Sequence, residues 1–182
     1  MNKKGLLSQK GLVVWLFGLS GSGKTTISSL LQEKLQEEGF FVMSLDGDVL
    51  RAGINSDLSF TEIDREENIR RAAEIAKIML QNDIVTICSF ITPLKKHRAQ
   101  AANIIGECYL EVFVDCPISV CESRDVKGLY KKAQSRQITN FTGISSGFEA
   151  PVHPQLTIHT DIESPEESME KVYRYIISFI KA

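Results

Sequence analysis

Gly18-Leu19-Ser20-Gly21-Ser22-Gly23-Lys24-Thr25 is the stretch of this sequence that decides the fold. It fits the pattern Gly-x-x-x-x-Gly-Lys-Ser/Thr at every fixed position. The apolar run over residues 12–17 before it predicts a buried strand, and residues 26–35 after it have the apolar spacing of a helix. The glycines therefore lie between a strand and a helix N-terminus, where free backbone N–H groups and the helix dipole attract a polyphosphate.

This pattern assigns a role to each part of the stretch. The backbone of residues 18–23, continuing to Thr26, is expected to hold the phosphates of a nucleoside triphosphate. Lys24 would reach the β- and γ-phosphates, and the Thr25 hydroxyl would bind Mg²⁺. An ordinary Gly/Ser turn is the alternative, but the preceding strand, the spacing, the lysine and the threonine together count against it.

Length and composition predict one domain with a hydrophobic core. The chain has 182 residues, of which 43% are hydrophobic, and its net charge of −2 gives no reason to expect nucleic acid or an acidic membrane as a partner. No run is long enough to span a membrane, and no apolar leader follows Lys3 and Lys4, so we expect a cytoplasmic protein. The cysteines form no Cys-x-x-Cys pair and are expected to be buried, reduced thiols: Cys88, Cys108, Cys116 and Cys121.

Apolar runs and helical patterns alternate along the rest of the chain. Strands are predicted over residues 40–45, 84–89, 109–115 and 155–159, and the strand over 40–45 is expected to be buried like the first. Helices are predicted after Thr61, from Lys95 to Gly106, at Pro117, and after the strong start signal Ser164-Pro165-Glu166-Glu167. Residues 1–11 are typical of a short lead-in, and 49–60 of irregular, turn-rich chain. Five strands that alternate with helices predict an α/β three-layer sandwich with a parallel sheet.

Two carboxylates, Asp46 and Asp48, directly follow the second predicted strand, at the edge where doubly wound sheets bind ligands. They are well placed to orient an acceptor hydroxyl and take its proton, unless one caps a helix and the other binds the backbone. Basic residues crowd the first turns of the next helix, where its dipole disfavours cations. They indicate either an anion to be bound or a solvated face, and the sequence leaves both open: Arg65, Arg70 and Arg71.

Residues 124–150 interrupt the alternation. The most basic run of the chain, from Arg124 to Lys132, is followed by a Gly/Ser-rich loop over residues 141–148. A flexible basic segment before the last strand is what a lid over phosphates requires, although a solvated helix and a plain loop would have the same composition. The phosphate loop alone is compatible with GTPases, motor ATPases and small-molecule kinases, and the short chain with its lid favours a kinase.

Five motifs in a fixed order resemble the adenylylsulfate kinase (APS kinase) family over residues 10–180. They are the phosphate loop at 15–26 and the segments 45–51, 60–71, 121–130 and 141–144; the first is generic and the other four together are specific. The resemblance implies a P-loop NTPase-type fold with a mobile lid, and a homodimer. It also implies the reaction: with Mg²⁺, the γ-phosphate of ATP passes to the 3′-hydroxyl of adenosine 5′-phosphosulfate, giving PAPS and ADP.

The resemblance implies roles for single residues as well. Asp46 or Asp48 would serve the acceptor hydroxyl, and Lys127 would stabilise charge on the transferring phosphoryl group. Arg124 would lie on the adenine or ribose side of ATP. The remaining matches concern the acceptor: Arg51, Arg65 and Asn68 for its phosphosulfate, Phe60 and Phe141 for stacking on its adenine, and Ile91, Thr92, Gly128, Leu129 and Thr142 elsewhere around it.

The chain departs from the family pattern at several positions. Val49 stands where the family usually has Asn, and Val126 where it has Pro. Residues 91–95 read Ile-Thr-Pro-Leu-Lys instead of Ile-Ser-Pro-Tyr-Arg, and Lys95 or Lys96 lacks the bidentate fork of the missing arginine. The alternatives are a kinase of this fold that acts on another nucleoside-5′-phosphate derivative, and a non-catalytic nucleotide-binding module.

Overall fold

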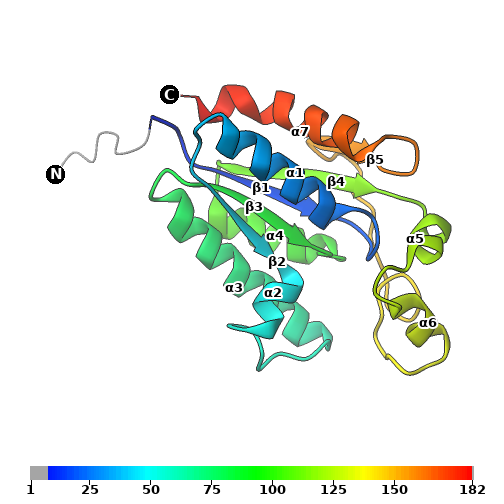
Figure 1. Ribbon diagram of the computed structural model, residues 1–182. Coiled ribbons are helices and arrows are strands. Elements are labelled where there is room, and N and C mark those ends of the chain that lie inside the picture. The colour runs from blue at the N-terminus through cyan, green and yellow to red at the C-terminus, as the bar shows by residue number, and fades with distance from the viewer. Residues whose placement is uncertain (1–7, 182) are drawn as a thin grey trace.

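The computed structural model describes residues 8–181, so residues 1–7 of the expected lead-in lie outside the described residues. Five strands form one sheet in the order β2-β3-β1-β4-β5, and all of their pairings are parallel (Figure 1). The strands are β1 (Leu12–Phe17), β2 (Val42–Asp46), β3 (Val85–Phe90), β4 (Tyr109–Asp115) and β5 (Leu156–His159). The predicted five-stranded parallel sheet is therefore confirmed.

Helices follow the strands as the sequence predicts, with two additions, the short helices over residues 47–52 and 129–134. They are α1 (Lys24–Glu37), α2 (Gly47–Ala52), α3 (Glu62–Leu80), α4 (Lys95–Ile105), α5 (Ile118–Arg124), α6 (Leu129–Gln134) and α7 (Pro165–Ile180). Ser164 and Glu167 form the expected capping box of α7. The expectation of irregular chain over 49–60 was wrong for its first residues, because Asp46 caps α2.

The central strand β1 shows how the three layers hold together. Leu12, Val14 and Leu16 belong to the apolar cluster that includes side chains of α1 and α7. Residues 13, 15 and 17 belong to the cluster on the opposite face, with α3 and α4. Since successive side chains of a strand point to opposite faces, one continuous apolar run supplies both layers of the core. Figure 1 shows α1 and α7 on one side of the sheet and α3 and α4 on the other.

Two expectations about burial were wrong. The second strand is not fully buried, because β2 lies at an edge of the sheet and exposes Met43, next to an exposed Phe41. Cys108 is exposed because it lies in the turn before β4 rather than inside the strand. The other three cysteines are buried, and all four are free thiols, as expected.

The carboxyl ends of the strands lie at one edge of the sheet, and the candidate site is built there (Figure 1). The chain of residues 124–150 lies beyond the ends of β1 and β4 and includes α6. Its buried residues Tyr130, Ala133 and Phe141 form a small apolar cluster with Cys116 and Cys121, which precede the segment in the chain. In the part of the chain that the structure describes, no helix combines the length and apolarity needed to cross a membrane.

Candidate active site

The phosphate-loop stretch folds between β1 and α1, and its glycines are required by the space around them. A Cβ atom on Gly18 would lie 2.4 Å from the backbone oxygen of Val114, so β1 and β4 leave no room for a side chain. Gly21 has a φ of 77° and its backbone lies close to Cys121. Glycine alone adopts this conformation without strain. The loop therefore keeps its shape only with these residues.

Lys24 is the first residue of α1 and folds back over the loop that precedes it. Its Nζ donates hydrogen bonds to the backbone oxygens of Gly18, at 2.9 Å, and Leu19, at 2.6 Å. Burial lowers the pKa of this amine to about 8, against the opposing effect of the carboxylates of Asp46 and Asp48. The pKa of Lys24 thus lies close to neutral pH, so a fraction of the amine is uncharged there. An anion beside it would favour the protonated form.

Thr25 links the phosphate loop to the end of β2. Its Oγ1 donates a hydrogen bond of 2.9 Å to Asp46 Oδ2, while Asp46 Oδ1 accepts the backbone N–H of Asp48 at 2.9 Å. Asp46 is therefore the N-cap of α2. This agrees with the alternative in which one of the two carboxylates caps a helix. Asp48 instead forms an exposed ion pair with Lys127 from the 124–150 segment, and Asp48 raises the pKa of that amine.

These oxygens also decide whether the site suits Mg²⁺. Across residues 8–181, no group of three or more His, Cys, Asp or Glu side chains is close enough to hold a metal unaided. A hydroxyl and a carboxylate in direct contact, Thr25 and Asp46, are nonetheless the oxygen donors that Mg²⁺ uses when phosphates and water complete its shell. The donor set therefore fits a magnesium ion that arrives with a nucleotide.

Three residues far along the chain support the phosphate loop. Thr160 Oγ1 donates to the backbone oxygen of Ser22 at 2.7 Å, and Tyr130 OH donates to that of Ser20 at 2.9 Å. Arg124, expected on the adenine or ribose side of ATP, donates to the backbone oxygens of Gly21 and Thr160. Sequence reasoning assigned no role to Tyr130, and Thr160 could be suspected only because it directly follows the last strand.

On the other side of β2, two of the residues predicted to bind the acceptor substrate lie near one aromatic ring. The guanidinium of Arg51 lies 4.4 Å from the ring centroid of Phe60, and that of Arg65 lies 5.7 Å from it. Burial lowers the pKa of both guanidinium groups, and the charge of Arg51 further lowers the pKa of Arg65. Two partly buried cations that repel each other beside an exposed ring form a site that would favour an anionic aromatic ligand.

Arg65 also connects this side to the glycine- and serine-rich loop. Its Nη1 donates to Thr142 Oγ1 at 3.1 Å, and its Nη2 donates to the backbone oxygen of Asn140. Phe141, between these two residues, is buried and packs edge-on against Tyr130, with centroids 4.9 Å apart. The structure thus brings Phe60 and Phe141 to the same region with different environments, since Phe60 is 55% exposed.

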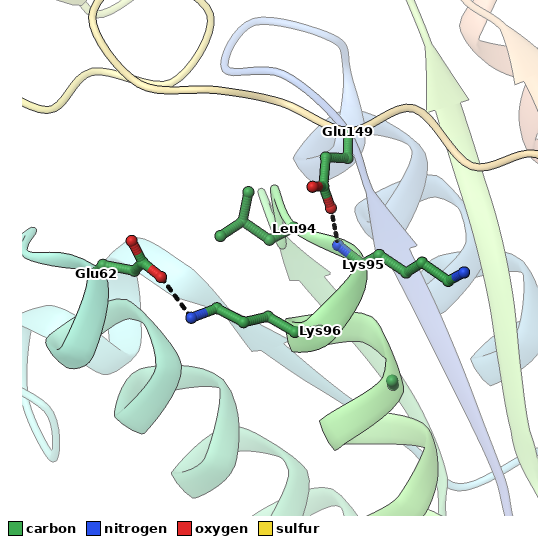
Figure 2. A pocket seen from close by; sticks show the side chains of 6 residues that line it. Glu62, Leu94, Lys95, Lys96 and Glu149 are labelled. Carbon is green, nitrogen blue, oxygen red and sulfur yellow. Dashed lines mark hydrogen bonds and ion pairs between the residues drawn. The ribbon is translucent and has the colours of Figure 1, made fainter.

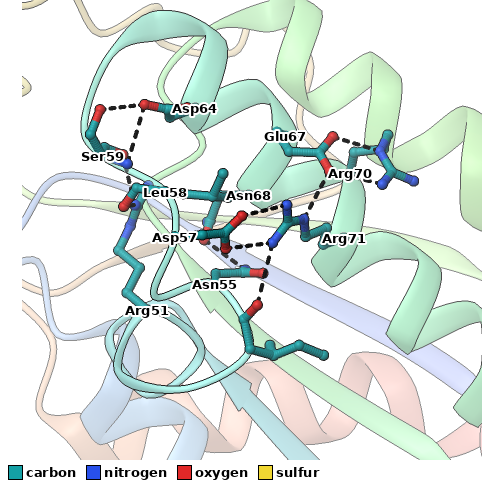
Figure 3. A network of polar contacts seen from close by, with 11 residues as sticks. Arg51, Asn55, Asp57, Leu58, Ser59, Asp64, Glu67, Asn68, Arg70 and Arg71 are labelled. Carbon is teal, nitrogen blue, oxygen red and sulfur yellow. Dashed lines mark hydrogen bonds and ion pairs between the residues drawn. The ribbon is translucent and has the colours of Figure 1, made fainter.

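The other cations at the start of α3 are neutralised by the chain itself (Figure 3). Arg70 and Arg71 both bind Glu67, and Arg71 also makes two hydrogen bonds to the carboxylate of Asp57. The bonds from Arg70 and Arg71 lower the pKa of Glu67 to about 2. The anions that Arg70 and Arg71 bind are thus side chains of the same chain, and Arg70 is exposed, as the solvated-face alternative expects. Asn68, in contrast, is buried, and within residues 8–181 its side-chain partner is Asn55.

The segment after β3 contains a buried hydroxyl and two lysines with different surroundings. Thr92 is buried with a φ of 41°, and its Oγ1 accepts a hydrogen bond of 2.9 Å from Trp15 Nε1. Figure 2 shows the open pocket beside it, where Lys96 pairs with Glu62 and the side chain of Lys95 extends away from that pair. Because Lys96 already has two carboxylate partners, Glu62 and Glu66, it is a poor substitute for the missing arginine.

The remaining predicted site residues lie at two ends of the same region. Ile91 is partly buried between β3 and Thr92. Gly128, with a φ of 64°, is the N-cap of α6, and Leu129 packs into the apolar cluster of the 124–150 segment. Lys127, the residue before Gly128, donates a hydrogen bond from its amine to Asp48.

Comparison with known proteins identifies the family. The family model described as adenylylsulphate kinase matches residues 10–159. The adenylyl-sulfate kinase of Halothermothrix orenii is 52% identical over 169 residues, covering 93% of this chain and 91% of that protein. The adenylyl-sulfate kinase of Clostridium acetobutylicum is 47% identical over 175 residues, covering 96% of this chain and 88% of that protein.

A solved structure agrees with both relatives. The Mycobacterium tuberculosis APS kinase, in complex with AMPPNP and APS, superposes with a TM-score of 0.89 at 41% identity. The match covers 92% of this chain and 98% of that structure. The chain belongs to the adenylylsulfate kinase family.

Proposed function

We propose that this chain transfers the γ-phosphate of ATP to the 3′-hydroxyl of adenosine 5′-phosphosulfate, giving PAPS and ADP. One observation carries the proposal. The hydrogen bond between Thr25 and Asp46 joins the phosphate loop to the N-terminus of α2, the helix that carries Arg51 in its last turn. ATP, the phosphoryl donor, and an anionic phosphoryl acceptor would therefore meet at Asp46. The named activity of the relatives supports the same reaction.

The nucleotide would bind along the loop from Gly18 to Thr26. Backbone N–H groups at the start of α1 would hold its phosphates, and Lys24 would leave its carbonyl partners for the β- and γ-phosphates. Mg²⁺ would be held by Thr25, with Asp46 beside it, and would neutralise charge on the transferring group. Arg124, which donates to the backbone oxygens of Gly21 and Thr160, would support the loop and would lie on the adenine or ribose side of ATP.

The acceptor would bind between α2, α3 and the glycine- and serine-rich loop. Arg51 and Arg65 would hold its phosphosulfate, Phe60 would stack on its adenine, and Asn68 would donate a hydrogen bond. The remaining matched residues would line the same space: Ile91, Thr92, Gly128, Leu129, Phe141 and Thr142. The 3′-hydroxyl would then point back toward the phosphate loop.

The two carboxylates would have different tasks. Asp46 or Asp48 would accept the proton of the 3′-hydroxyl as its oxygen attacks the γ-phosphorus and ADP leaves. Asp46 accepts a hydrogen bond from Thr25 and caps α2, whereas Asp48 forms the exposed ion pair with Lys127. Once a nucleotide attracts Lys127, Asp48 would be released to act on the hydroxyl. Lys127 would stabilise charge on the phosphoryl group.

We also propose that the chain folds as a single domain of residues 1–182, with residues 124–150 as a lid that closes over bound nucleotide, and that it forms a homodimer in the cytoplasm. The contacts of Lys127 with Asp48 and of Arg65 with Thr142 support the lid, because they connect it to both proposed substrates. Light scattering measures the mass in solution, and a monomer would contradict the dimer.

Acceptor-dependent release of ADP from Mg-ATP tests the reaction. The acceptors to compare are adenosine 5′-phosphosulfate, AMP and a set of nucleoside diphosphates. A strong preference for the phosphosulfate is expected. Turnover with another acceptor alone would make the chain a kinase for a different nucleoside-5′-phosphate derivative, and no acceptor dependence would make it a nucleotide-binding module.

A further inference from the structure

A buried pair of amides lies beneath the proposed acceptor site. Asn55 Nδ2 donates a hydrogen bond of 2.9 Å to Asn68 Oδ1. Asn55 is fully buried, and Asn68 is only 5% exposed. An asparagine side chain has an acceptor at one end and a donor at the other. The partner of Asn68 Oδ1 therefore decides which end of Asn68 faces the site.

The free end of Asn68 is a donor. Among the residues that the structure describes, Asn68 Nδ2 makes no hydrogen bond, and it is not one of the buried polar atoms without a partner, so it retains contact with solvent. Asn68 follows Arg65 by three residues in α3, which places both side chains on the same side of the helix. The amide donor thus lies beside a cation that would bind the acceptor.

The reverse pairing, with Asn68 Nδ2 donating to Asn55 Oδ1, is less favourable. In the observed pairing the unpaired buried atom is the oxygen Asn55 Oδ1. Reversal would instead bury an NH₂ group of Asn55 with both of its hydrogens unused. Buried N–H groups without a partner are rarer than under-used carbonyl oxygens, and each costs the desolvation of a donor. The observed polarity is therefore the stable one.

The turn that carries Asn55 is fixed from outside (Figure 3). The backbone N–H of Asn55 donates to Leu50 O at 2.8 Å, and Arg71 Nη1 donates to the oxygen of Ile54 at 3.3 Å. The same guanidinium binds Asp57 at 2.7 and 2.8 Å, and Glu67 at 2.8 Å. A planar guanidinium held by two carboxylates is a rigid support. Asn55 consequently has one position from which to bind Asn68.

We propose that Asn55 is a positioning residue, which holds Asn68 with its NH₂ group toward the anionic part of the acceptor. This inference rests on the proposed function. Asn55 itself touches neither substrate, since it is buried beneath Asn68. Without it, the amide of Asn68 would turn freely and would present its oxygen to the anion for part of the time, which costs binding free energy.

Asn55→Leu tests the proposal without adding a charge. Leucine has a similar shape and removes the unpaired buried oxygen, so the melting temperature is expected to stay close to that of the unaltered chain. The KM for adenosine 5′-phosphosulfate is expected to rise roughly tenfold, as the loss of one hydrogen bond to an anion implies, while the KM for ATP stays unchanged. Ser56→Ala, at the exposed neighbouring position in the same turn, is the matched control and should change neither constant.

Asn55→Asp gives a second, stronger test. A carboxylate only accepts, so Asn68 would have to donate Nδ2 to it and present its oxygen to the acceptor, which should raise the acceptor KM further. In an Asn68→Ala background, neither substitution of Asn55 should raise the acceptor KM again, because the effect passes through Asn68. A simple repulsion between Asp at position 55 and the acceptor would persist in that background.

The outcomes distinguish a failure of the proposed function from a failure of the positioning role of Asn55. If the unaltered chain shows no turnover with adenosine 5′-phosphosulfate, the proposed function is wrong and the inference is overturned with it. If the unaltered chain turns over and Asn55→Leu keeps the same acceptor KM, only the positioning role is overturned. A rise in the KM for both ATP and acceptor, with a lower melting temperature, would likewise overturn it and make Asn55 a structural residue.

Discussion

Thr25 Oγ1 donates a hydrogen bond of 2.9 Å to Asp46 Oδ2, and this bond joins the phosphate loop after β1 to the end of β2, two strands away. The other oxygen of the same carboxylate caps α2. Asp46 therefore has a structural task that is visible and a catalytic task that is proposed. Substitutions can separate the two tasks, because a cap requires an oxygen atom whereas a magnesium site requires charge.

Asp46→Asn is expected to keep the fold and lose activity. Asparagine caps a helix about as well as aspartate, so the free energy of unfolding should change by no more than about 0.5 kcal/mol. The Mg²⁺ concentration for half-maximal rate should rise, and kcat should fall at least about tenfold, since the carboxylate charge is gone. Asp46→Ala should in addition cost about 0.5–2 kcal/mol of stability. Wild-type magnesium dependence in Asp46→Asn would make Asp46 a cap only.

Lys24→Ala is expected to abolish most turnover. The amine that now binds Gly18 and Leu19 would no longer be available to the β- and γ-phosphates, and kcat should fall by at least about a hundredfold. The rate of ADP release with Mg-ATP and the acceptor measures kcat. Lys34→Ala, on the exposed side of the same helix, removes a lysine without touching the loop and should leave kcat unchanged. Normal kcat in Lys24→Ala would remove the phosphate-loop assignment.

The lowered pKa of Lys24 predicts how nucleotide binding depends on pH. Phosphates favour the protonated amine, so above a free-enzyme pKa of about 8 binding must take up a proton. Affinity for ATP should therefore fall as pH rises beyond 8, approaching tenfold per pH unit. Calorimetric titration between pH 7 and 9.5 measures this fall, and Lys24→Ala should flatten it.

The lowered pKa of Lys24 also affects folding stability, but in the opposite direction. Stability is expected to rise with pH, whereas the affinity for ATP falls. Because the pKa of Lys24 in the folded chain lies below the ordinary lysine value of 10.5, the unfolded chain binds more protons between pH 8 and 10.5. The contribution of Lys24 to the free energy of unfolding therefore increases with pH in this window when no nucleotide is bound. Denaturant titrations of the unaltered chain and Lys24→Ala across the window compare the two slopes; equal slopes would contradict the shift.

The sequence was sufficient for the fold because its signals are local. The apolar run of β1 and the capping box at Ser164 each lie within a few neighbouring residues, and both were placed correctly. Which strand lies at the edge is decided by the order of the strands, which no single run encodes. Burial of β2 was overestimated for this reason, and Cys108 was placed inside because it adjoins an apolar run.

The residues of the candidate site were likewise predictable from the sequence only where their signals are local. Lys24 and Thr25 could be assigned roles because one contiguous motif contains them, and the resemblance supplied the more distant acceptor residues. Tyr130 and Asn55 were missed because their partners, Ser20 and Asn68, are brought to them only by the folded chain. A tyrosine that supports a loop 110 residues away has no spacing by which the sequence could reveal it.

Lys127→Ala is expected to separate catalysis from stability in the proposed lid. Its ion pair with Asp48 joins side chains that are 58% and 70% exposed, so losing it should change the free energy of unfolding by less than about 1 kcal/mol. The kcat should nevertheless fall by about a hundredfold or more, because the cation beside the transferring phosphoryl is lost. Lys131→Ala, an exposed lysine of the same segment, is the control for charge. Equal kcat values in the two variants would contradict a catalytic role for Lys127.

Phe60 and Phe141 were predicted as a pair that stacks on the acceptor adenine, and their environments predict different responses to substitution. Phe60 is 55% exposed with Arg51 against its ring, so Phe60→Ala should cost little stability. It should weaken acceptor binding by about 1–3 kcal/mol, the range for a base stacked on an aromatic ring. Phe141 is buried against Tyr130, so Phe141→Ala should cost about 3–5 kcal/mol of stability.

Thermal unfolding and acceptor titration, performed on both variants, distinguish stacking from packing. Phe141→Leu keeps most of the buried volume while removing the aromatic face, so it isolates any stacking by Phe141 from its part in the lid cluster. A loss of acceptor affinity in both Phe60→Ala and Phe141→Leu is the expected result for a sandwiched adenine. Unchanged affinity in Phe60→Ala would leave its ring as a support for Arg51, and unchanged affinity in Phe141→Leu alone would mean that the adenine stacks on one side only.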